Sequence, residues 1–181
     1  MQPLSITGAL LYTPRIYSDQ RGDFLESFRM SDLGQPFDLA QVNCSVSRRG
    51  VLRGVHFADV PPGQAKYVMC VSGEVLDVVV DVRVGSPTFG RWEAVRLDDV
   101  ARQGVFIGEG LGHAFLALSE SATVVYLCSS AYDPAREHGI HPLDPDLAIE
   151  WPIVDTPILS DKDAAAPTLK EALDSGILPS C

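Results

Sequence analysis

Short apolar runs separated by turn-forming residues fill most of the chain between about residues 8 and 132. Clusters such as SDQRG, SRRG and VPPGQ stand between the runs, and no stretch of this region repeats its apolar residues with a helical period. Strands this short and this regularly spaced are typical of a β-sandwich or a closed β-barrel. The expected strands cover residues 9–17, 23–29, 39–47, 51–57, 65–72, 74–83, 91–97, 104–108, 113–119 and 123–132.

Several of the expected strands have one polar face. In residues 74–83, Asp77 and Asp81 share one side, because side chains alternate between the two faces of a strand. Residues 39–47 carry a similar row of Gln, Asn and Ser side chains. These faces either meet water or line the mouth of a small barrel, where such barrels hold ligands. The alternation alone leaves both interpretations open.

The chain after residue 133 follows a different pattern. A Pro- and Asp-rich stretch leads to residues 166–177, which predict a short helix. Thr168 and Glu171 form a capping-box pair, and Gly176 suits the end of a helix. No linker-like segment separates this tail from the expected strands, so we expect it to pack on the barrel.

The length of 181 residues suits one domain with a hydrophobic core. We therefore expect a single domain over residues 1–181, with an all-β barrel over roughly residues 6–133 and a loop and short helical tail over residues 134–181. The formal net charge of −10 argues against nucleic-acid binding, which needs a basic surface. A small anionic ligand would need a local cluster of Arg or Lys side chains.

The cysteines and the N-terminus bear on the compartment. Cys44, Cys70 and Cys128 lie in apolar runs, as reduced core cysteines do. The N-terminus lacks a signal-peptide pattern, and no apolar run is long enough to cross a bilayer. The sequence thus predicts a cytoplasmic protein with no membrane or nucleic-acid partner.

The histidines are the first candidates for chemistry. His56 and His113 each have a glycine within the two preceding residues of a strand-like run. His138 and His141 lie in the Pro- and Asp-rich stretch, where we expect them to be solvated. Metal binding in small barrels usually needs a His-x-His pair, and the residue two positions after His56 is Ala58. We therefore expect no metal and no other cofactor.

Other reaction classes lack their signatures. The chain contains no Gly-x-Ser-x-Gly nucleophile elbow and no phosphate-binding glycine loop. Acid–base chemistry by side chains remains. A His base, a carboxylate to orient it, a Lys to hold an oxyanion and a Tyr to return a proton suffice for proton transfer beside a carbonyl.

Several segments resemble one protein family in the same order along the chain. They are residues 49–57 (RGVLRGVHF), 64–93, 110–118 (GLGHAFLAL), 126–138 (YLCSSAYDPAREH) and 159–163 (LSDKD). Together they closely resemble the dTDP-4-dehydrorhamnose 3,5-epimerases. The resemblance implies a cupin-type jelly-roll barrel, a homodimer, and a dTDP-linked 4-keto-6-deoxyhexose as substrate.

The resemblance also implies catalytic roles. The catalytic base falls on His56 and its orienting carboxylate on Asp163, which would fix the imidazole tautomer and support the cation. Lys66 matches the residue that stabilises the enolate oxygen, because the carbon acid is far weaker than imidazolium. Tyr126 matches the proton donor on the opposite face of the sugar ring.

Binding roles carry over from the same resemblance. Arg53 and Arg21 match residues near the diphosphate, and Tyr132 matches a ring that stacks on thymine. Some N-terminal contacts of the family cross the dimer interface, so Arg21 or Glu26 is expected to serve the neighbouring subunit. The further implied substrate contacts are Gln41, Asn43, Glu26, His113, Glu137 and Lys162.

Two local expectations concern the strands around the site. Arg53 and His56 would point to opposite faces of an unbroken strand, so a bulge or bend is expected at Gly54. Asp77 and Asp81 share a face, and one of them is expected to support His56 or Lys66.

The number of centres inverted is the open functional question. The main prediction is inversion at C3 and C5. Where the family more often has Gly-Phe-Ala-His-Gly-Phe, this chain has Gly-Leu-Gly-His-Ala-Phe over residues 110–115. Gly112 and Ala114 are expected to affect how the sugar's hydroxyl edge is held, which favours the alternative of a single-centre epimerase of antibiotic deoxysugars. A ketoisomerase and a non-catalytic sugar-nucleotide binder are the remaining alternatives.

Overall fold

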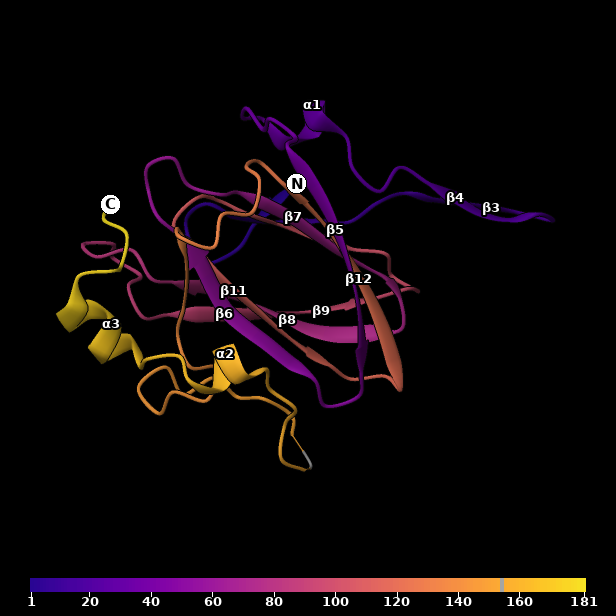
Figure 1. Ribbon diagram of the computed structural model, residues 1–181. Helices are drawn as coiled ribbons and strands as arrows, with labels where there is room; N and C mark the ends of the chain where they lie inside the picture. Colours follow the sequence, from indigo (N-terminus) through magenta and orange to yellow (C-terminus); the bar gives the residue numbers. More distant parts are fainter. Residues whose placement is uncertain (154) are drawn as a thin grey trace.

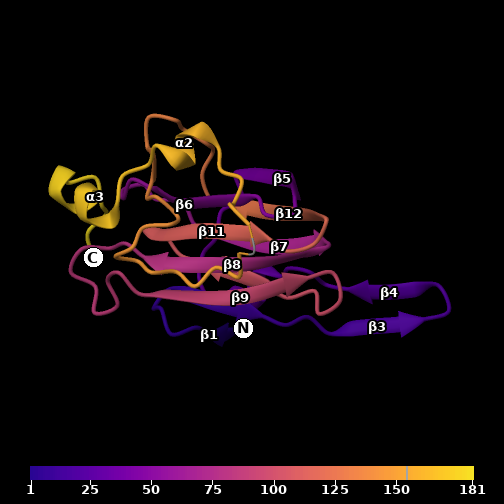
Figure 2. The same cartoon turned by 90° about the horizontal axis from the view of Figure 1, so that it is seen from below.

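Two antiparallel sheets face each other and form a jelly-roll barrel in the computed structural model, which describes residues 1–153 and 155–181 (Figures 1 and 2). The six-stranded sheet runs in the order β1 (Gln2–Pro3), β2 (Ala9–Tyr12), β10 (Gly104–Ile107), β7 (Lys66–Ser72), β12 (Ser121–Cys128) and β5 (Gln41–Arg48). The five-stranded sheet runs β13 (Glu137–Gly139), β6 (Leu52–Ala58), β11 (Leu111–Ala117), β8 (Glu74–Asp81) and β9 (Trp92–Asp98). The all-β barrel prediction is confirmed.

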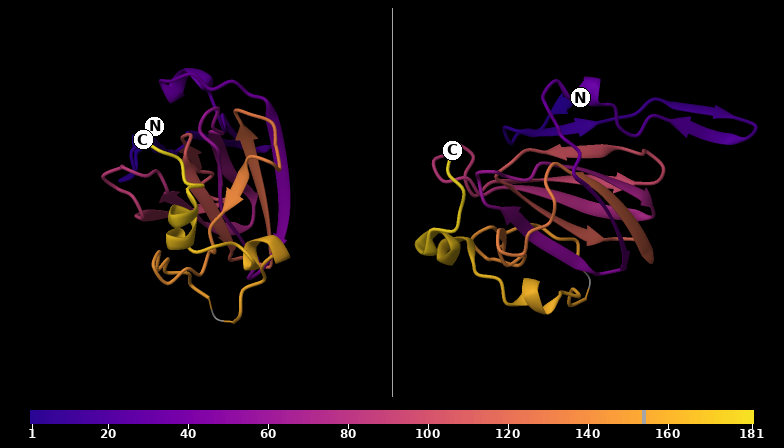
Figure 3. Two further views of the ribbon diagram at one scale, coloured as in Figure 1. Left: turned by 60° about the vertical axis from the view of Figure 1, so that its left-hand side comes forward. Right: turned by 45° about the horizontal axis from the view of Figure 1, so that its top comes forward.

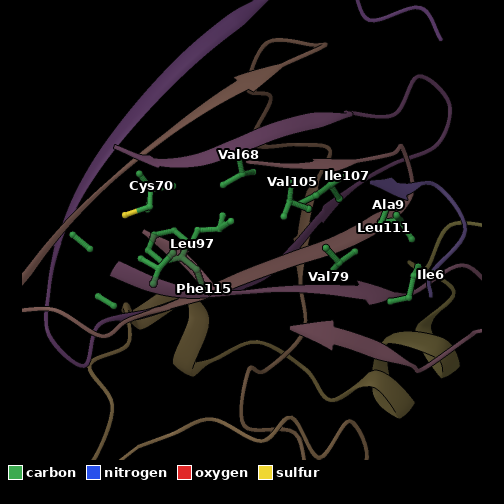
Figure 4. Packing of buried hydrophobic residues seen from close by; sticks show 14 residues of the cluster. Ile6, Ala9, Val68, Cys70, Val79, Leu97, Val105, Ile107, Leu111 and Phe115 are labelled. Carbon is green, nitrogen blue, oxygen red and sulfur yellow. The ribbon is translucent and has the colours of Figure 1, made fainter. Parts of the chain in front are cut away.

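The space between the sheets is filled by one face of each strand. Val68 and Cys70 of β7 meet Val79 of β8 and Phe115 of β11 in the largest buried cluster (Figure 4). The alternation of apolar and polar residues along each strand therefore places the apolar side chains in the barrel interior. Toward one end of the barrel the inward-facing positions become polar, and this end holds the pocket described below.

The outer face of the five-stranded sheet is covered by the C-terminal tail (Figures 1 and 3). Val55 and Phe57 of β6 pack there with Ile140, and Leu169 of α3 (Leu169–Ser175) joins the same cluster. The predicted capping box of α3 is present, and Gly176 ends the helix in the left-handed region at φ 73°. The predictions of a C-terminal helix and of its packing on the barrel are confirmed.

The outer face of the six-stranded sheet is covered only in part. Leu33 of α1 (Met30–Leu33) and Phe37 pack with Tyr67 and Phe106. The hairpin of β3 (Ile16–Asp19) and β4 (Gly22–Leu25) instead projects away from the barrel (Figures 1–3). Within residues 1–153 and 155–181, the edge strand β5 pairs only with β12.

Two expectations from the sequence are wrong. Cys44 is exposed, because it lies on the outer face of the edge strand β5, where no layer covers it. His138 is half-buried rather than solvated, because β13 pairs with β6 and brings its ring against Phe57 and Asp59. Cys70 and Cys128 are buried free thiols, as expected.

Asp81 does not support the site. Its buried carboxylate accepts hydrogen bonds from Arg83, Ser86 and Thr88, and it holds the connection from β8 to β9. Burial alone raises the pKa of Asp81, but these hydrogen bonds outweigh it and hold the pKa at about 2. The charged carboxylate therefore contributes to stability above the ordinary pKa near 3.8, and the contribution is lost as the pH falls toward 2.

We predict that Asp81→Asn lowers the free energy of unfolding by about 2 kcal/mol at pH 7. The deficit relative to wild type should shrink as the pH falls from about 4 to about 2, where wild-type Asp81 itself becomes protonated. Urea unfolding followed by circular dichroism at one protein concentration measures the loss of stability at pH 7 and its change with pH. Asp174→Asn, which changes an exposed carboxylate, is the matched control and should change stability by less than about 0.5 kcal/mol. Equal effects of the two variants would contradict this account of Asp81.

Candidate active site

A pocket of about 260 Å³ opens at one end of the barrel and receives side chains from both sheets. Asn43 comes from β5, His56 from β6, Lys66 from β7 and Tyr126 from β12. The short helix α2 (Asp161–Ala164) closes one side. The predicted residues that line this pocket are Asn43, Arg53, His56, Lys66, Tyr126, Tyr132, Glu137, Lys162 and Asp163.

A bulge in β6 places Arg53 and His56 on the same face. His56 pairs with His113 and Arg53 pairs with Phe115, so two residues of β6 stand opposite one residue of β11. The first of the two is Gly54, whose φ of 110° lies in the left-handed region that favours glycine. The expected bulge at Gly54 is therefore confirmed, and it turns Arg53 toward the pocket instead of away from it.

His56 and Asp163 form a hydrogen-bonded pair. The imidazole Nε2 lies 2.6 Å from the Asp163 carboxylate, which is buried while the imidazole is partly exposed. Ser160 caps α2 by accepting from the Asp163 backbone N–H. Burial alone raises the pKa of Asp163, but its bonds to His56, Ser160 and the Gly54 backbone outweigh it, so its pKa lies below the ordinary value. Asp163 is thus ionised and ready to orient an imidazolium.

Lys66 and Tyr126 face His56 from the opposite sheet. The Lys66 side chain is buried and lines the pocket. Burial raises the pKa of the Tyr126 phenol, with a smaller contribution from Cys128, so the phenol carries its proton at neutral pH. A potential proton donor and a cation therefore lie across the cavity from a potential base.

Polar contacts fix the side of the pocket formed by β5 and the loop after β12. Arg53 donates to the buried Ser47 hydroxyl at 3.1 Å. Gln41 donates to the Asn43 side-chain oxygen at 2.7 Å and accepts from the Tyr132 backbone N–H at 2.9 Å. These bonds hold a guanidinium and an exposed aromatic ring beside the cavity.

A second recess of about 350 Å³ adjoins this pocket. Gln64, Tyr132 and Glu137 line both cavities. Arg136 lines the second recess but not the pocket around His56. The shared lining residues place the two cavities side by side, with Tyr132 common to both.

Four predicted binding residues lie outside the pocket lining. Gln41 contacts Asn43 and the Tyr132 backbone, as described above. His113 is buried in the barrel interior, with Nε2 2.7 Å from Asp77. Arg21 lies in the exposed β3–β4 turn paired with Asp19, and Glu26 pairs with Arg29.

The expectation that Asp77 or Asp81 supports His56 or Lys66 is wrong. Asp77 bonds to His113 and Asp81 bonds to Arg83, and in the described parts of the chain neither carboxylate bonds to His56 or Lys66. Alternation predicted correctly that the two share a face, but not how far along the barrel each one lies. Gly112 and Ala114 also differ from expectation, because both face the outer layer beneath the tail.

Two residues of the pocket were missed. Gln64 precedes β7 and donates to the Ser130 carbonyl, and no local pattern identified it. Ser160 was detectable, because Ser160 and Asp163 have the spacing of a helix N-cap. That signal would also have predicted α2 and the direction of Asp163.

Other kinds of site find no support in the described residues. Across residues 1–153 and 155–181, no group of three or more His, Cys, Asp or Glu side chains is placed to hold a metal ion. Within the same ranges, no helix has both the length and the apolar character that a membrane span requires.

Comparison with known proteins agrees with this geometry. The family model described as dTDP-4-dehydrorhamnose 3,5-epimerase matches residues 3–171. A dTDP-4-dehydrorhamnose 3,5-epimerase of Mycolicibacterium smegmatis is 59% identical, with 97% of this chain and 89% of the relative aligned. A dTDP-4-dehydrorhamnose 3-epimerase of Streptomyces niveus is 57% identical, with 99% and 88% aligned.

Solved structures are equally similar. The crystal structure of ChmJ, a 3′-monoepimerase from Streptomyces bikiniensis in complex with dTDP-quinovose, is 56% identical with a TM-score of 0.96 and covers 99% of this chain and 93% of that chain. The rmlC epimerase of Mycobacterium tuberculosis is 54% identical with a TM-score of 0.96 and covers 99% and 92%. The chain therefore belongs to the dTDP-4-dehydrorhamnose 3,5-epimerase family.

Proposed function

We propose that this protein inverts C3 and C5 of dTDP-4-keto-6-deoxy-D-glucose, giving dTDP-4-keto-L-rhamnose. Both carbons adjoin the C4 ketone, so removal of a proton from either gives an enolate whose charge rests on the C4 oxygen. The observation that carries the proposal is the placement of His56 opposite Lys66 and Tyr126 in one small cavity. The reaction needs no net oxidation and no cofactor.

His56 acts as the base in this proposal. Its bond to Asp163 fixes the tautomer that leaves the other ring nitrogen free to accept a proton, and the ionised carboxylate then stabilises the imidazolium. Lys66 donates to the developing enolate oxygen. One such donor typically contributes about 3 kcal/mol of transition-state stabilisation. Its burial strengthens the interaction, because little water competes for the oxyanion.

Tyr126 returns a proton in this proposal. Inversion requires the proton to leave from one face of the sugar ring and return on the other. His56 belongs to the five-stranded sheet and Tyr126 to the six-stranded sheet, so a ring bound between them has one group on each side. The raised pKa of Tyr126 keeps its proton available until the enolate forms.

In this proposal the nucleotide part of the substrate lies beside Arg53, Tyr132 and Lys162. Arg53 lies beside the catalytic cavity, and a guanidinium can bond two oxygens of a diphosphate. Tyr132, which is exposed and lines both cavities, offers a stacking face for thymine. Lys162 adds positive charge to the same cavity in an otherwise acidic chain.

We predict that His56→Ala lowers turnover by about 100- to 10,000-fold while dTDP binding is retained, because only the base is removed. Turnover and calorimetric dTDP affinity measure the two effects. His138→Ala is the matched control, since His138 also pairs with an aspartate, Asp59, at 2.7 Å but lies outside the pocket lining. Equal losses in the two variants would remove His56 from the role of base.

A single-centre reaction is the second candidate, because relatives named as 3-epimerases are as similar as those named as 3,5-epimerases. The one sequence difference that favoured it, at Gly112 and Ala114, lies on the outer face of β11 and does not line the cavity. In this proposal, His56, Tyr126 and Lys66 of the one pocket act on a ring that shifts so that either carbon meets the base. Inversion of both centres therefore remains our proposal.

Incubation with dTDP-4-keto-6-deoxy-D-glucose in heavy water tests the proposal. We predict deuterium at both C3 and C5, read by NMR, with the L-lyxo ketone accumulating. Both positions adjoin one ketone whose enolate Lys66 can stabilise. Exchange confined to C3 after long incubation with ample enzyme would establish the single-centre alternative.

The same proposal includes a homodimer that works in the cytoplasm. The eight-residue edge strand β5 exposes Val42 and Val46, which are 56% and 66% exposed, and the projecting hairpin exposes Phe24 at 67%. Unpaired strand edges and apolar patches are costly to leave in water, which favours cover by a second copy. A hairpin laid on its partner would carry Arg21 toward the partner's surface. The free thiols suit a reducing compartment.

We predict that the double variant Phe24→Lys/Val46→Lys sediments near the chain mass of 19.6 kDa, whereas wild type sediments near twice that mass. Two lysines in the proposed interface would bury unpaired charge. Val100→Lys is the control, because Val100 is 78% exposed and lies outside both β5 and the hairpin. Wild type at monomer mass, or a dimeric double variant, would contradict the proposed interface.

A further inference from the structure

Gly112 and Ala114 of β11 lie directly behind the bulge that carries the proposed base. A Cβ placed on Gly112 would lie 2.6 Å from Val55 Cγ1, so a side chain at this position requires Val55 to move. A Cβ placed on Gly54 would lie 2.6 Å from Ala114 Cβ and 2.5 Å from the His113 carbonyl oxygen. Gly54 and Val55 therefore pack this closely against β11 because Gly54 and Gly112 have no Cβ atom.

The outer side of the bulge is anchored as well. Val55 exchanges two backbone hydrogen bonds with Ile140, at 3.0 and 2.9 Å. Its side chain is fully buried beneath the tail. Val55 is thus held between Gly112 of β11 and Ile140, which follows β13, so a shift of its backbone also moves its neighbour His56.

The bulge also contacts the orienting carboxylate. A backbone hydrogen bond from Gly54 is one of the interactions that lower the pKa of Asp163. Both members of the His56–Asp163 pair therefore depend on the position of the same two residues. Arg53 is anchored independently, because its side chain donates to Ser47 and its backbone pairs with Phe115.

We propose that Gly112 is a positioning residue, whose missing side chain leaves room for the Gly54–Val55 bulge so that His56, held by Asp163, meets the substrate carbon at the required distance. Its effect on the reaction passes through the bulge and not through contact with the sugar. This inference rests on the proposed role of His56 as the base. It assigns a function to the segment in which this chain differs from the more usual family pattern.

The test is the variant Gly112→Ala in the full-length protein. The added methyl group pushes on Val55, and displacement of a catalytic group by about 1 Å typically costs up to about 100-fold in rate. We expect kcat to fall about 10- to 100-fold, whereas the dTDP dissociation constant stays at the wild-type value because Arg53 does not move. The double variant Gly112→Ala/Val55→Ala removes the clashing Cγ1 and should restore most of the lost turnover.

Gly139→Ala is the matched control. Gly139 pairs with His56 from the other side, in β13, and a Cβ there would meet its nearest atoms only at 3.5 Å or more. Its kcat should match wild type. Equal kcat values for Gly112→Ala and Gly139→Ala would overturn the proposal, and so would a parallel loss of dTDP affinity or a double variant as slow as Gly112→Ala.

Further outcomes separate a failure to fold and a failure of the proposed function from a failure of the positioning role. If Gly112→Ala does not accumulate as folded protein, an active, folded double variant supports the contact with Val55, and an unfolded double variant overturns it. If wild type itself shows no solvent exchange into the sugar, the proposed function fails. If wild type exchanges and Gly112→Ala exchanges as fast, only the positioning role fails.

Discussion

The hydrogen bond between His56 and Asp163 requires two distant parts of the chain to meet at one end of the barrel. His56 belongs to β6, whereas Asp163 comes from α2 in the tail, 107 residues later. The tail delivers this carboxylate because β13 pairs with β6, and because Ile140 and Leu169 pack on the outer face of the same sheet. An apolar layer on one side of the sheet thus sets the geometry of a polar pair at its edge, which makes the site sensitive to packing far from the ligand.

Charge is distributed to match an anionic ligand. The chain carries a formal net charge of −10, yet one cavity is lined by three basic side chains, Arg53, Lys66 and Lys162, against two carboxylates, Glu137 and Asp163. No ion pair in residues 1–153 and 155–181 includes Lys66, although its side chain is buried. Burying a lysine side chain without an ion-pair partner is costly. The anionic ligand of the proposed function would offset this cost, which would couple ligand binding to stability through Lys66.

The sequence was most informative where a local pattern has one structural meaning. Alternation predicted the strands, the spacing of Thr168 and Glu171 predicted the cap of α3, and the conflict between Arg53 and His56 predicted the bulge at Gly54. Alternation assigns a face but not a height along the barrel, so it could not tell which histidine Asp77 would meet. It also could not show that β5 is an edge strand, because strand order is set by long-range pairing.

Three His–Asp pairs of nearly equal length show why local chemistry alone does not define the base. His56, His113 and His138 lie 2.6, 2.7 and 2.7 Å from their carboxylates. His113 and Asp77 are both buried inside the barrel, and neither lines the pocket that His56 faces. His138 lies outside the pocket lining. Only His56 combines a buried, ionised carboxylate behind the ring with a cavity in front of it, and that combination depends on the β6 bulge rather than on the histidine itself.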